Sequence, residues 1–180
     1  MTTSVDRLHL VRGGRGDAAR LAAFARAQFV ATFGAVNTAH HMASYLAVTY
    51  GEAQQERELM DPAWTTFLME TADRELAAFA QVSRDTELVT PAIGHAEVRR
   101  FYVDARWHGQ GVAARLMETV LAEATGWGAK ALVLGVWEHN PRGIAFYRKV
   151  GFHPVGQTIF DLGGDLQTDL VFRRPLTADA

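Results

Sequence analysis

The sequence predicts one α/β (α+β) domain, residues 1–180, built around a mixed β-sheet. Segments with strand-like and helix-like spacing follow one another in the order β, three helices, then β-β-β-α-β-α-β-β. The run Lys130–Trp137 is almost fully apolar, which is typical of a central strand covered on both faces. No repeat, low-complexity tract or long linker divides the 180 residues, of which 48% are hydrophobic, so a single core is expected.

The first third of the chain is predicted to contain one strand and three helices. A short strand is expected at Leu8–Val11. Asp17 is expected to cap a helix through "AARLAAFARAQFVATF", where apolar residues recur at helical spacing. A second helix is predicted at Ala39–Gly51, closed by its glycine, and a third in "EAQQERELM", stopped by the Asp61-Pro62 step.

The rest of the chain is predicted to supply most of the sheet. Trp64–Thr71 and Glu75–Arg84 have the pattern of a hairpin, and "GHAEVRRFYVD" continues the strand signal. The elements expected after it are a helix at Val112–Thr125, the apolar strand Lys130–Trp137, a helix at Pro141–Val150 and a closing antiparallel hairpin that turns at Gly163-Gly164.

Composition excludes several kinds of function. A net charge of −2 leaves no sequence-wide basic field for nucleic acid. The absence of cysteine excludes disulfides, thiolate metal sites and a cysteine nucleophile, and no serine lies in a G-x-S-x-G elbow. No apolar run is long enough for a membrane span or a signal peptide, so a cytoplasmic protein is expected. His40-His41 and Glu138-His139 lack metal-ligand spacing, and no metal site is predicted.

A glycine-containing turn at Gly109–Ala113 joins a predicted strand to a predicted helix. Such a turn leaves backbone N–H groups free at the positive end of the helix dipole, where an anion can bind. Gly109, Gly111 and Ala113 carry no side chain longer than a methyl, so a diphosphate could approach the backbone closely. An ordinary strand-to-helix turn, in which glycine adopts a positive φ angle, would explain the same residues. The residues fit neither a phosphate-binding P-loop nor the G-x-G-x-x-G motif of dinucleotide enzymes.

A second informative stretch is "NPRGIAFYRKVGF". Asn140 followed by proline is a good helix start, and Gly151 is a good stop. Asn140 could thus be only a cap, and Tyr147 only a core aromatic residue. If the strands Glu97–Val103 and Lys130–Trp137 are neighbours, this stretch and the glycine turn share one rim of the sheet, where ligands of open α/β sheets bind.

Together these stretches make Glu97–Phe152 resemble the Gcn-five-related N-acetyltransferase (GNAT) family. "FYVDARWHGQGVAARLME" is similar to the family's pyrophosphate loop, [Q/R]-x-x-G-x-[G/A], with His108, Gly111 and Ala113 at the motif positions. His108 departs from the usual arginine or glutamine. "WEHNPRGIAFYRKVGF" is similar to its second signature, an asparagine followed seven residues later by a tyrosine. "FVATF" and "EREL" in the amino-terminal half resemble the PaiA-like polyamine acetyltransferase subgroup.

The resemblance implies a mixed, mostly antiparallel sheet of about seven strands flanked by helices, with acetyl-CoA as the cofactor. Backbone groups of Phe101, Tyr102 and Val103 would hold the pantetheine arm, with the Val103 N–H near the acetyl oxygen. Asn140 would bind the pantetheine amide region. Arg142, Arg148 or Lys149 could meet the 3′-phosphate, although a solvated helix face is the better explanation of these charges. The implied diphosphate site comprises His108, Gly109, Gln110, Gly111, Val112, Ala113 and Ala114.

With no cysteine and no activated serine, a covalent acyl-enzyme is not expected, and an acceptor amine should attack the thioester directly in a ternary complex. By resemblance, Tyr147 would protonate the departing thiolate, since a phenol has similar basicity. Glu97 is the candidate general base, acting through water, with His95 and His108 as alternatives. Ordinary strand-surface charge explains Glu97 equally well.

The resulting hypothesis is an N-acetyltransferase that acts on a primary amine. The alternatives are a non-catalytic acyl-CoA-binding or sensing domain and an acetyltransferase acting on protein amino termini or lysines. No nucleic-acid or membrane partner is expected, and the protein could be a monomer or a homodimer. A group of acidic residues in the acceptor region could attract a polycation such as spermidine or be plain solvated charge: Glu52, Glu56, Glu58, Glu70 and Asp73.

Overall fold

The computed structural model describes residues 4–176, which form a seven-stranded sheet with five α-helices. The strands are β1 (His9–Arg12), β2 (Trp64–Glu70), β3 (Leu76–Ser83), β4 (His95–Val103), β5 (Ala131–Trp137), β6 (His153–Leu162) and β7 (Asp165–Pro175). The helices are α1 (Ala18–Phe33), α2 (Ala39–Thr49), α3 (Glu52–Met60), α4 (Val112–Gly126) and α5 (Pro141–Lys149), with short 3-10 turns at Ser4–Arg7, Arg15–Asp17 and Ala105–Trp107.

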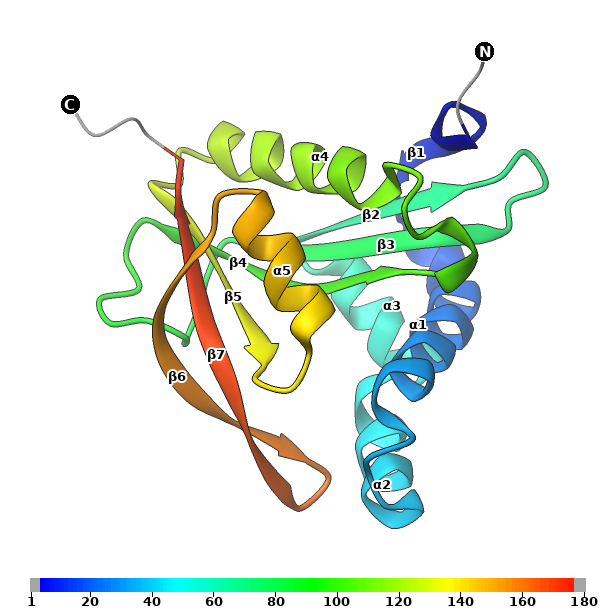
Figure 1. Cartoon of the computed structure of the whole chain (residues 1–180). Helices are drawn as coiled ribbons and strands as arrows, with labels where there is room; N and C mark the ends of the chain where they lie inside the picture. The colour runs from blue at the N-terminus through cyan, green and yellow to red at the C-terminus, as the bar shows by residue number, and fades with distance from the viewer. Residues whose placement is uncertain (1–3, 177–180) are drawn as a thin grey trace.

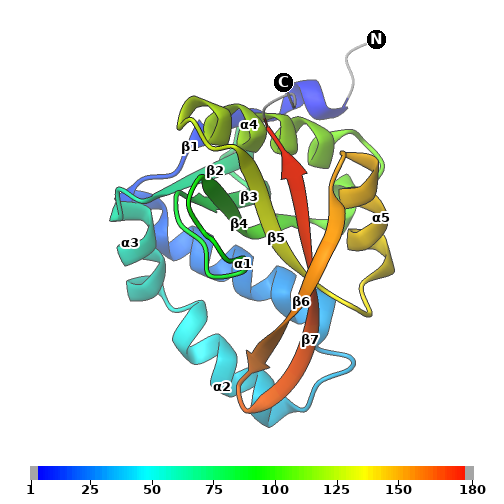
Figure 2. The same cartoon turned by 90° about the vertical axis from the view of Figure 1, so that its left-hand side faces the viewer.

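The strands are ordered β1-β2-β3-β4-β5-β7-β6, and every neighbouring pair is antiparallel except β4 and β5. Helices α4 and α5 cover one face of the sheet, and α1, α2 and α3 lie on the other (Figures 1 and 2). The prediction of a mixed, mostly antiparallel sheet of seven strands flanked by helices is therefore confirmed. No helix within residues 4–176 is long and apolar enough to cross a membrane.

Each face of the sheet has its own apolar core. Helix α4 buries an apolar stripe against β3, β4 and β5: Val112, Leu116, Met117, Val120 and Ala124. On the other face, Leu21, Ala25 and Phe29 of α1 and two residues of α2 pack over Leu68 and Phe79. These stripes recur every three or four residues, which is why the helices were recognisable in the sequence.

The expected elements are all present and differ only at their ends. Asp17 occupies the N-cap position of α1, as predicted, but its side chain does not cap the helix. Asp17 already has helical dihedral angles (φ −95°, ψ −4°) and forms no cap hydrogen bond to α1. The 3-10 turn Arg15–Asp17 precedes the helix, and the carboxylate instead accepts from the Gly14 N–H at 2.8 Å and from Arg20 Nε at 2.8 Å. Since Arg20 also reaches Glu70 at 2.5 Å, Asp17 ties α1 to the sheet.

Strands β4 and β5 pair over only a short stretch. Their register runs from His95↔Ala131 to Glu97↔Val133, although both strands continue beyond it. On its other side β4 remains paired with β3, but the register shifts because Val82 faces Val98 while Gln81 faces Arg100. The extra residue, Arg99, forms a β-bulge, which bends and twists a strand. Beyond it β4 diverges from β5, as the green and yellow arrows show in Figure 1.

A buried ion pair holds α3 against β4. Arg100 NH2 lies 3.0 Å from Glu58 Oε1, and Arg100 NH1 contacts the second carboxylate oxygen and Gln81 Oε1. Only 12% of the Arg100 side chain and 7% of the Glu58 side chain are exposed. Because both charges are buried, each depends on the other for compensation.

Removal of one partner should therefore be costly. Glu58→Ala is expected to lower the free energy of unfolding by about 3–5 kcal/mol, because it leaves a buried guanidinium uncompensated. Glu56→Ala, which removes an exposed ion pair with Arg15, should cost no more than about 1 kcal/mol. Urea denaturation of both variants measures the difference, and equal losses would show that burial of the Arg100–Glu58 pair has no energetic consequence.

Candidate active site

A cavity of about 570 Å³ opens where β4 and β5 separate. Its lining is drawn from α1, α2, β4, the start of α4, β5, α5, β6 and β7. Side chains from both faces of the sheet meet in it: Phe101 and Val103 pack with α4 and α5, and Tyr102 packs with α1 and α2. The cavity therefore connects the two sides of the sheet through the gap between the strands.

The start of α4 forms one end of the cavity. Gly109 (φ +74°) and Gly111 (φ +84°) both have left-handed dihedral angles, which residues with a Cβ atom adopt only with strain. No side chain caps the helix at Gly111, so the first N–H groups of α4 have no protein side-chain acceptor. Those groups, with the helix dipole, make an anion-binding site. Of the seven predicted diphosphate residues all but Gln110 line the cavity, and Gln110 donates to the Arg106 carbonyl at 2.6 Å instead.

His108 links the end of β4 to α5. Its Nε2 lies 2.9 Å from the Val103 carbonyl oxygen, and its Nδ1 lies 2.7 Å from Arg142 NH1. Because a guanidinium can only donate, Nδ1 must be the acceptor and Nε2 must carry the proton. His108 is therefore a neutral imidazole that holds Arg142 close to the start of α4. His108, which replaces the arginine or glutamine usual at this motif position, thus positions the Arg142 guanidinium.

The edge of β4 that faces the gap presents unpaired backbone groups. Asp104 N–H donates to the Ala77 carbonyl of β3 at 2.9 Å. Because hydrogen-bonding direction alternates along a strand, the N–H groups of Val103 and Phe101 point the opposite way, toward the gap. An extended ligand could therefore pair with β4 there as a further strand would.

Asn140 and Tyr147 both belong to α5, and both line the cavity. Asn140 Oδ1 accepts from the Gly143 N–H at 3.0 Å, so the predicted cap is confirmed. The Tyr147 ring packs against Phe101, Phe146 and Phe152, with ring centroids 6.4, 5.4 and 5.9 Å away. Burial among these rings raises the pKa of the Tyr147 phenol above its ordinary value, so the hydroxyl remains protonated at neutral pH.

Glu97 and His95 do not line this cavity. The Glu97 side chain is buried, accepts from Thr86 Oγ1 at 2.6 Å and lies 3.5 Å from Arg99 NH1. Burial raises its pKa, partly offset by these two partners. His95 Nε2 lies 3.3 Å from Arg173 Nε. The structure thus brings Tyr147, Asn140 and the glycine turn together but not Glu97.

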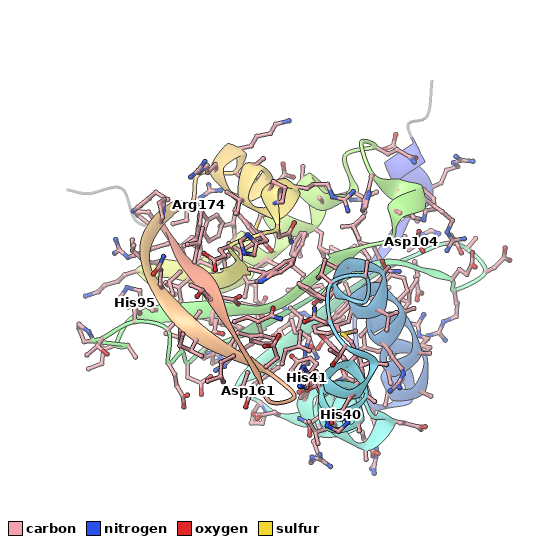
Figure 3. The ribbon with its side chains drawn as sticks, turned by 60° about the horizontal axis from the view of Figure 1, so that its bottom comes forward. His40, His41, His95, Asp104, Asp161 and Arg174 are labelled. Carbon is pink, nitrogen blue, oxygen red and sulfur yellow. The ribbon has the colours of Figure 1, made fainter. Side chains whose placement is uncertain are left out.

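The histidines do not gather elsewhere either. His40 and His41 lie together on α2, well apart from His95 in Figure 3. Within the described part of the chain no group of three or more histidine and carboxylate side chains has the arrangement of a metal site.

On the α1 and α2 side the cavity has aromatic walls that were not predicted. Phe29 and Tyr45 stack at 4.7 Å, Phe33 meets Trp137 edge-on at 5.7 Å, and Tyr45 meets Phe160 at 5.3 Å. We call this the aromatic chamber. The spacing of the two phenylalanines, four residues apart on α1, was visible in the sequence but is equally typical of a core helix.

Asp169 of β7 is the only acidic residue among the described residues that line the cavity. It faces Trp137 across the β5–β7 ladder, and no described residue forms a hydrogen bond or ion pair with its carboxylate. Its Oδ2 would lie 3.1 Å from a Cβ atom on Gly135. Burial, and secondarily the charge of Glu138, raise the pKa of Asp169 to about 6.

The acidic residues predicted to face an acceptor lie elsewhere. None of Glu52, Glu56, Glu58, Glu70 and Asp73 lines the cavity. Three of them are engaged in ion pairs, Glu56 with Arg15, Glu58 with Arg100 and Glu70 with Arg20. Asp169 was missed because "LQTDLVFRR" indicates only a strand, and register alone decides that its carboxylate faces a cavity.

Comparison with known proteins agrees with this geometry. The model of the acetyltransferase (GNAT) family matches residues 29–152. An uncharacterized N-acetyltransferase of Lactobacillus delbrueckii subsp. lactis is 29% identical over 170 residues, covering 93% of this chain and 96% of the relative. An uncharacterized N-acetyltransferase of Mycobacterium bovis is 32% identical over 160 residues, covering 89% and 98%.

The fold has solved counterparts. The PaiA N-acetyltransferase of Thermoplasma acidophilum in complex with coenzyme A superposes with a TM-score of 0.77 at 17% identity, covering 93% of this chain and 98% of that one. A putative phosphinothricin N-acetyltransferase superposes with a TM-score of 0.70 at 18% identity, covering 95% and 99%. The chain belongs to the acetyltransferase (GNAT) family and is an N-acetyltransferase that uses acetyl-CoA.

Proposed function

We propose that this enzyme transfers the acetyl group of acetyl-CoA to a small primary amine by direct attack in a ternary complex. The observation that carries the proposal is a single cavity lined by both the start of α4 and Tyr147. An anion site and a protonated phenol in one cavity suit a cofactor that has a diphosphate and a thioester.

The coenzyme would lie on the α4 and α5 side of the sheet. Its diphosphate would accept hydrogen bonds from the N–H groups of Gly111, Val112 and Ala113, with Arg142 adding positive charge. Its pantetheine arm would pair with β4 at Phe101 and Val103. These residues have their N–H groups toward the gap, which supports the placement.

The chemical step needs a nucleophile, an oxyanion donor and an acid. The neutral amine forms a C–N bond with the acetyl carbon, and the Val103 N–H stabilises the charge that develops on the acetyl oxygen. The C–S bond then breaks with its electron pair on sulfur, and the Tyr147 phenol donates a proton to that sulfur. The raised pKa of Tyr147 keeps this proton in place until the leaving group needs it.

The size of the cavity, about 570 Å³, favours a small acceptor over a polypeptide. The turn of the β6–β7 hairpin packs directly on α2, since a Cβ atom on Gly163 would lie 2.3 Å from the His41 carbonyl oxygen. The β6–β7 turn and α2 therefore lie side by side, near the labels of His41 and Asp161 in Figure 3. The Glu97 side chain lies outside the cavity. Glu97 could therefore act as the general base only through water molecules that connect its carboxylate to the amine.

Removal of the phenol hydroxyl should reduce turnover without affecting cofactor binding. Tyr147→Phe is expected to lower kcat by about 10²- to 10⁴-fold, the usual contribution of a general acid. The Kd for acetyl-CoA, measured by calorimetry, should stay within about threefold, because the ring and its packing remain. Thiol release with an amine panel measures kcat, and an unchanged kcat would remove Tyr147 from the acid role.

The glycine turn is expected to matter for affinity. Gly111→Ala forces a residue with a Cβ atom into the left-handed region at a cost of about 1–2 kcal/mol, or lets the turn shift its N–H groups. The Kd for coenzyme A should therefore rise about tenfold or more. Gly156→Ala on exposed β6, where a Cβ atom meets nothing within 4 Å, is the matched control and should bind like the wild type. Equal affinities would mean that the start of α4 does not hold the diphosphate.

A further inference from the structure

The aromatic chamber contains a carboxylate without a protein partner. By contrast, each buried acidic residue within residues 4–176 has one: Glu58 has Arg100, Glu70 and Asp17 share Arg20, and Glu97 has Thr86 and Arg99. Asp169 is partly buried and has none among the described residues. A carboxylate removed from water without compensation costs stability, so a bound cation would be its natural partner.

Asp169 also lies in the part of the sheet where β4 and β5 have separated. It is in register with Trp137, beyond Val133 where β5 has parted from β4. Gly135 of β5 lies next to the carboxylate, and its missing side chain leaves room there, since a Cβ atom would approach Asp169 Oδ2 to 3.1 Å. The carboxylate is therefore close to the opening through which an acceptor must meet the thioester.

The surroundings specify what kind of cation fits. The remaining chamber walls are mainly rings, those of Phe29, Phe33, Tyr45, Trp137 and Phe160. Rings suit an apolar body. Arg100, which also lines the cavity, is paired with Glu58. One carboxylate can compensate one charge, whereas a polyamine would leave its other ammonium groups among the rings.

We propose that Asp169 binds the ammonium group of the acceptor, and that the acceptor is a primary amine with a single positive charge and an apolar or aromatic body. This inference rests on the proposed function. Bound in this way, the ammonium transfers one proton from nitrogen to an Asp169 carboxylate oxygen, which yields a neutral carboxylic acid and a neutral amine. The freed electron pair on nitrogen then attacks the acetyl carbon.

Charged and titratable groups from the surrounding elements act on Asp169. Tyr45 of α2 and Glu138, in the turn after β5, interact electrostatically with Asp169. Arg100 of β4 acts in turn on Tyr45, and the ring of His139 meets Trp137 edge-on. Glu138 and burial favour the protonated acid, which is the direction a proton acceptor needs.

The test compares Asp169→Asn with Glu52→Gln, an exposed carboxylate of α3 that does not line the cavity. Initial rates are measured for 2-phenylethylamine, hexylamine and spermidine at saturating acetyl-CoA. Asp169→Asn should lower kcat/KM for the two monoamines by about 30-fold or more, as expected when one partner of a buried charge pair is lost. The KM for acetyl-CoA should be unchanged, and Glu52→Gln should behave like the wild type. Equal kcat/KM in Asp169→Asn and wild type, or a wild-type preference for spermidine, would overturn the inference.

Binding separates this inference from the proposed function. Calorimetry measures monoamine affinity for the coenzyme A-saturated protein. If the wild type turns over no amine but binds a monoamine that Asp169→Asn does not, the acetyl-transfer proposal fails and the ammonium site stands. If the wild type turns over monoamines and both proteins bind them equally, the ammonium site fails and the acetyl-transfer proposal stands.

Stability against pH provides a readout that does not depend on substrate. The pKa of Asp169 is raised in the folded protein from 3.8 to about 6, so the folded state holds the extra proton and loses relative stability as pH rises through that interval. The Asp169→Asn variant has no ionisable group at this position, so its stability does not decrease in this way as the pH rises. Its Tm should exceed that of the wild type at pH 7.5, and the difference should vanish near pH 4. A lower Tm at pH 7.5 would mean that Asp169 has a stabilising partner within the protein, which contradicts the inference.

Discussion

Strands β4 and β5 share only the pairs from His95↔Ala131 to Glu97↔Val133, and the whole site depends on their separation beyond that point. A fully paired sheet would leave no free backbone edge at Phe101 and Val103 and no passage between its two faces. The bulge at Arg99 bends β4 away from β5, while β3 continues to hold its other edge. The local insertion of one residue thus creates both the cofactor edge and the cavity.

The two sides of the gap between β4 and β5 also differ in charge. On the α4 and α5 side are the positive end of α4 and Arg142, which a neutral His108 holds in place. On the α1 and α2 side are aromatic rings and one carboxylate, Asp169. In the mechanism that we propose, an anionic coenzyme and a cationic acceptor would therefore bind on opposite faces of the sheet, and their reacting groups would meet in the gap. An unpaired Asp169 is a cost to folding that a binding role would explain.

Much of the cofactor side could be predicted from the sequence because its features are local. The positive φ angles at Gly109 and Gly111, the Asn140 cap and the α4 stripe all follow from residues close together in the chain. The acceptor side could not be predicted, because the chamber combines rings from α1, α2, β5 and β6 with a carboxylate from β7. The register between strands that are distant in the sequence decides that Asp169 faces the cavity and that Glu97 does not. Residue spacing within one segment does not reveal this register.

The most direct measurement is a crystal structure of the enzyme with coenzyme A bound. The account predicts the diphosphate within about 2.7–3.2 Å of the N–H groups at the start of α4, the pantetheine arm along β4, and the sulfur within hydrogen-bond reach of the Tyr147 hydroxyl. A coenzyme bound outside the gap between β4 and β5, or a sulfur remote from Tyr147, would contradict the account.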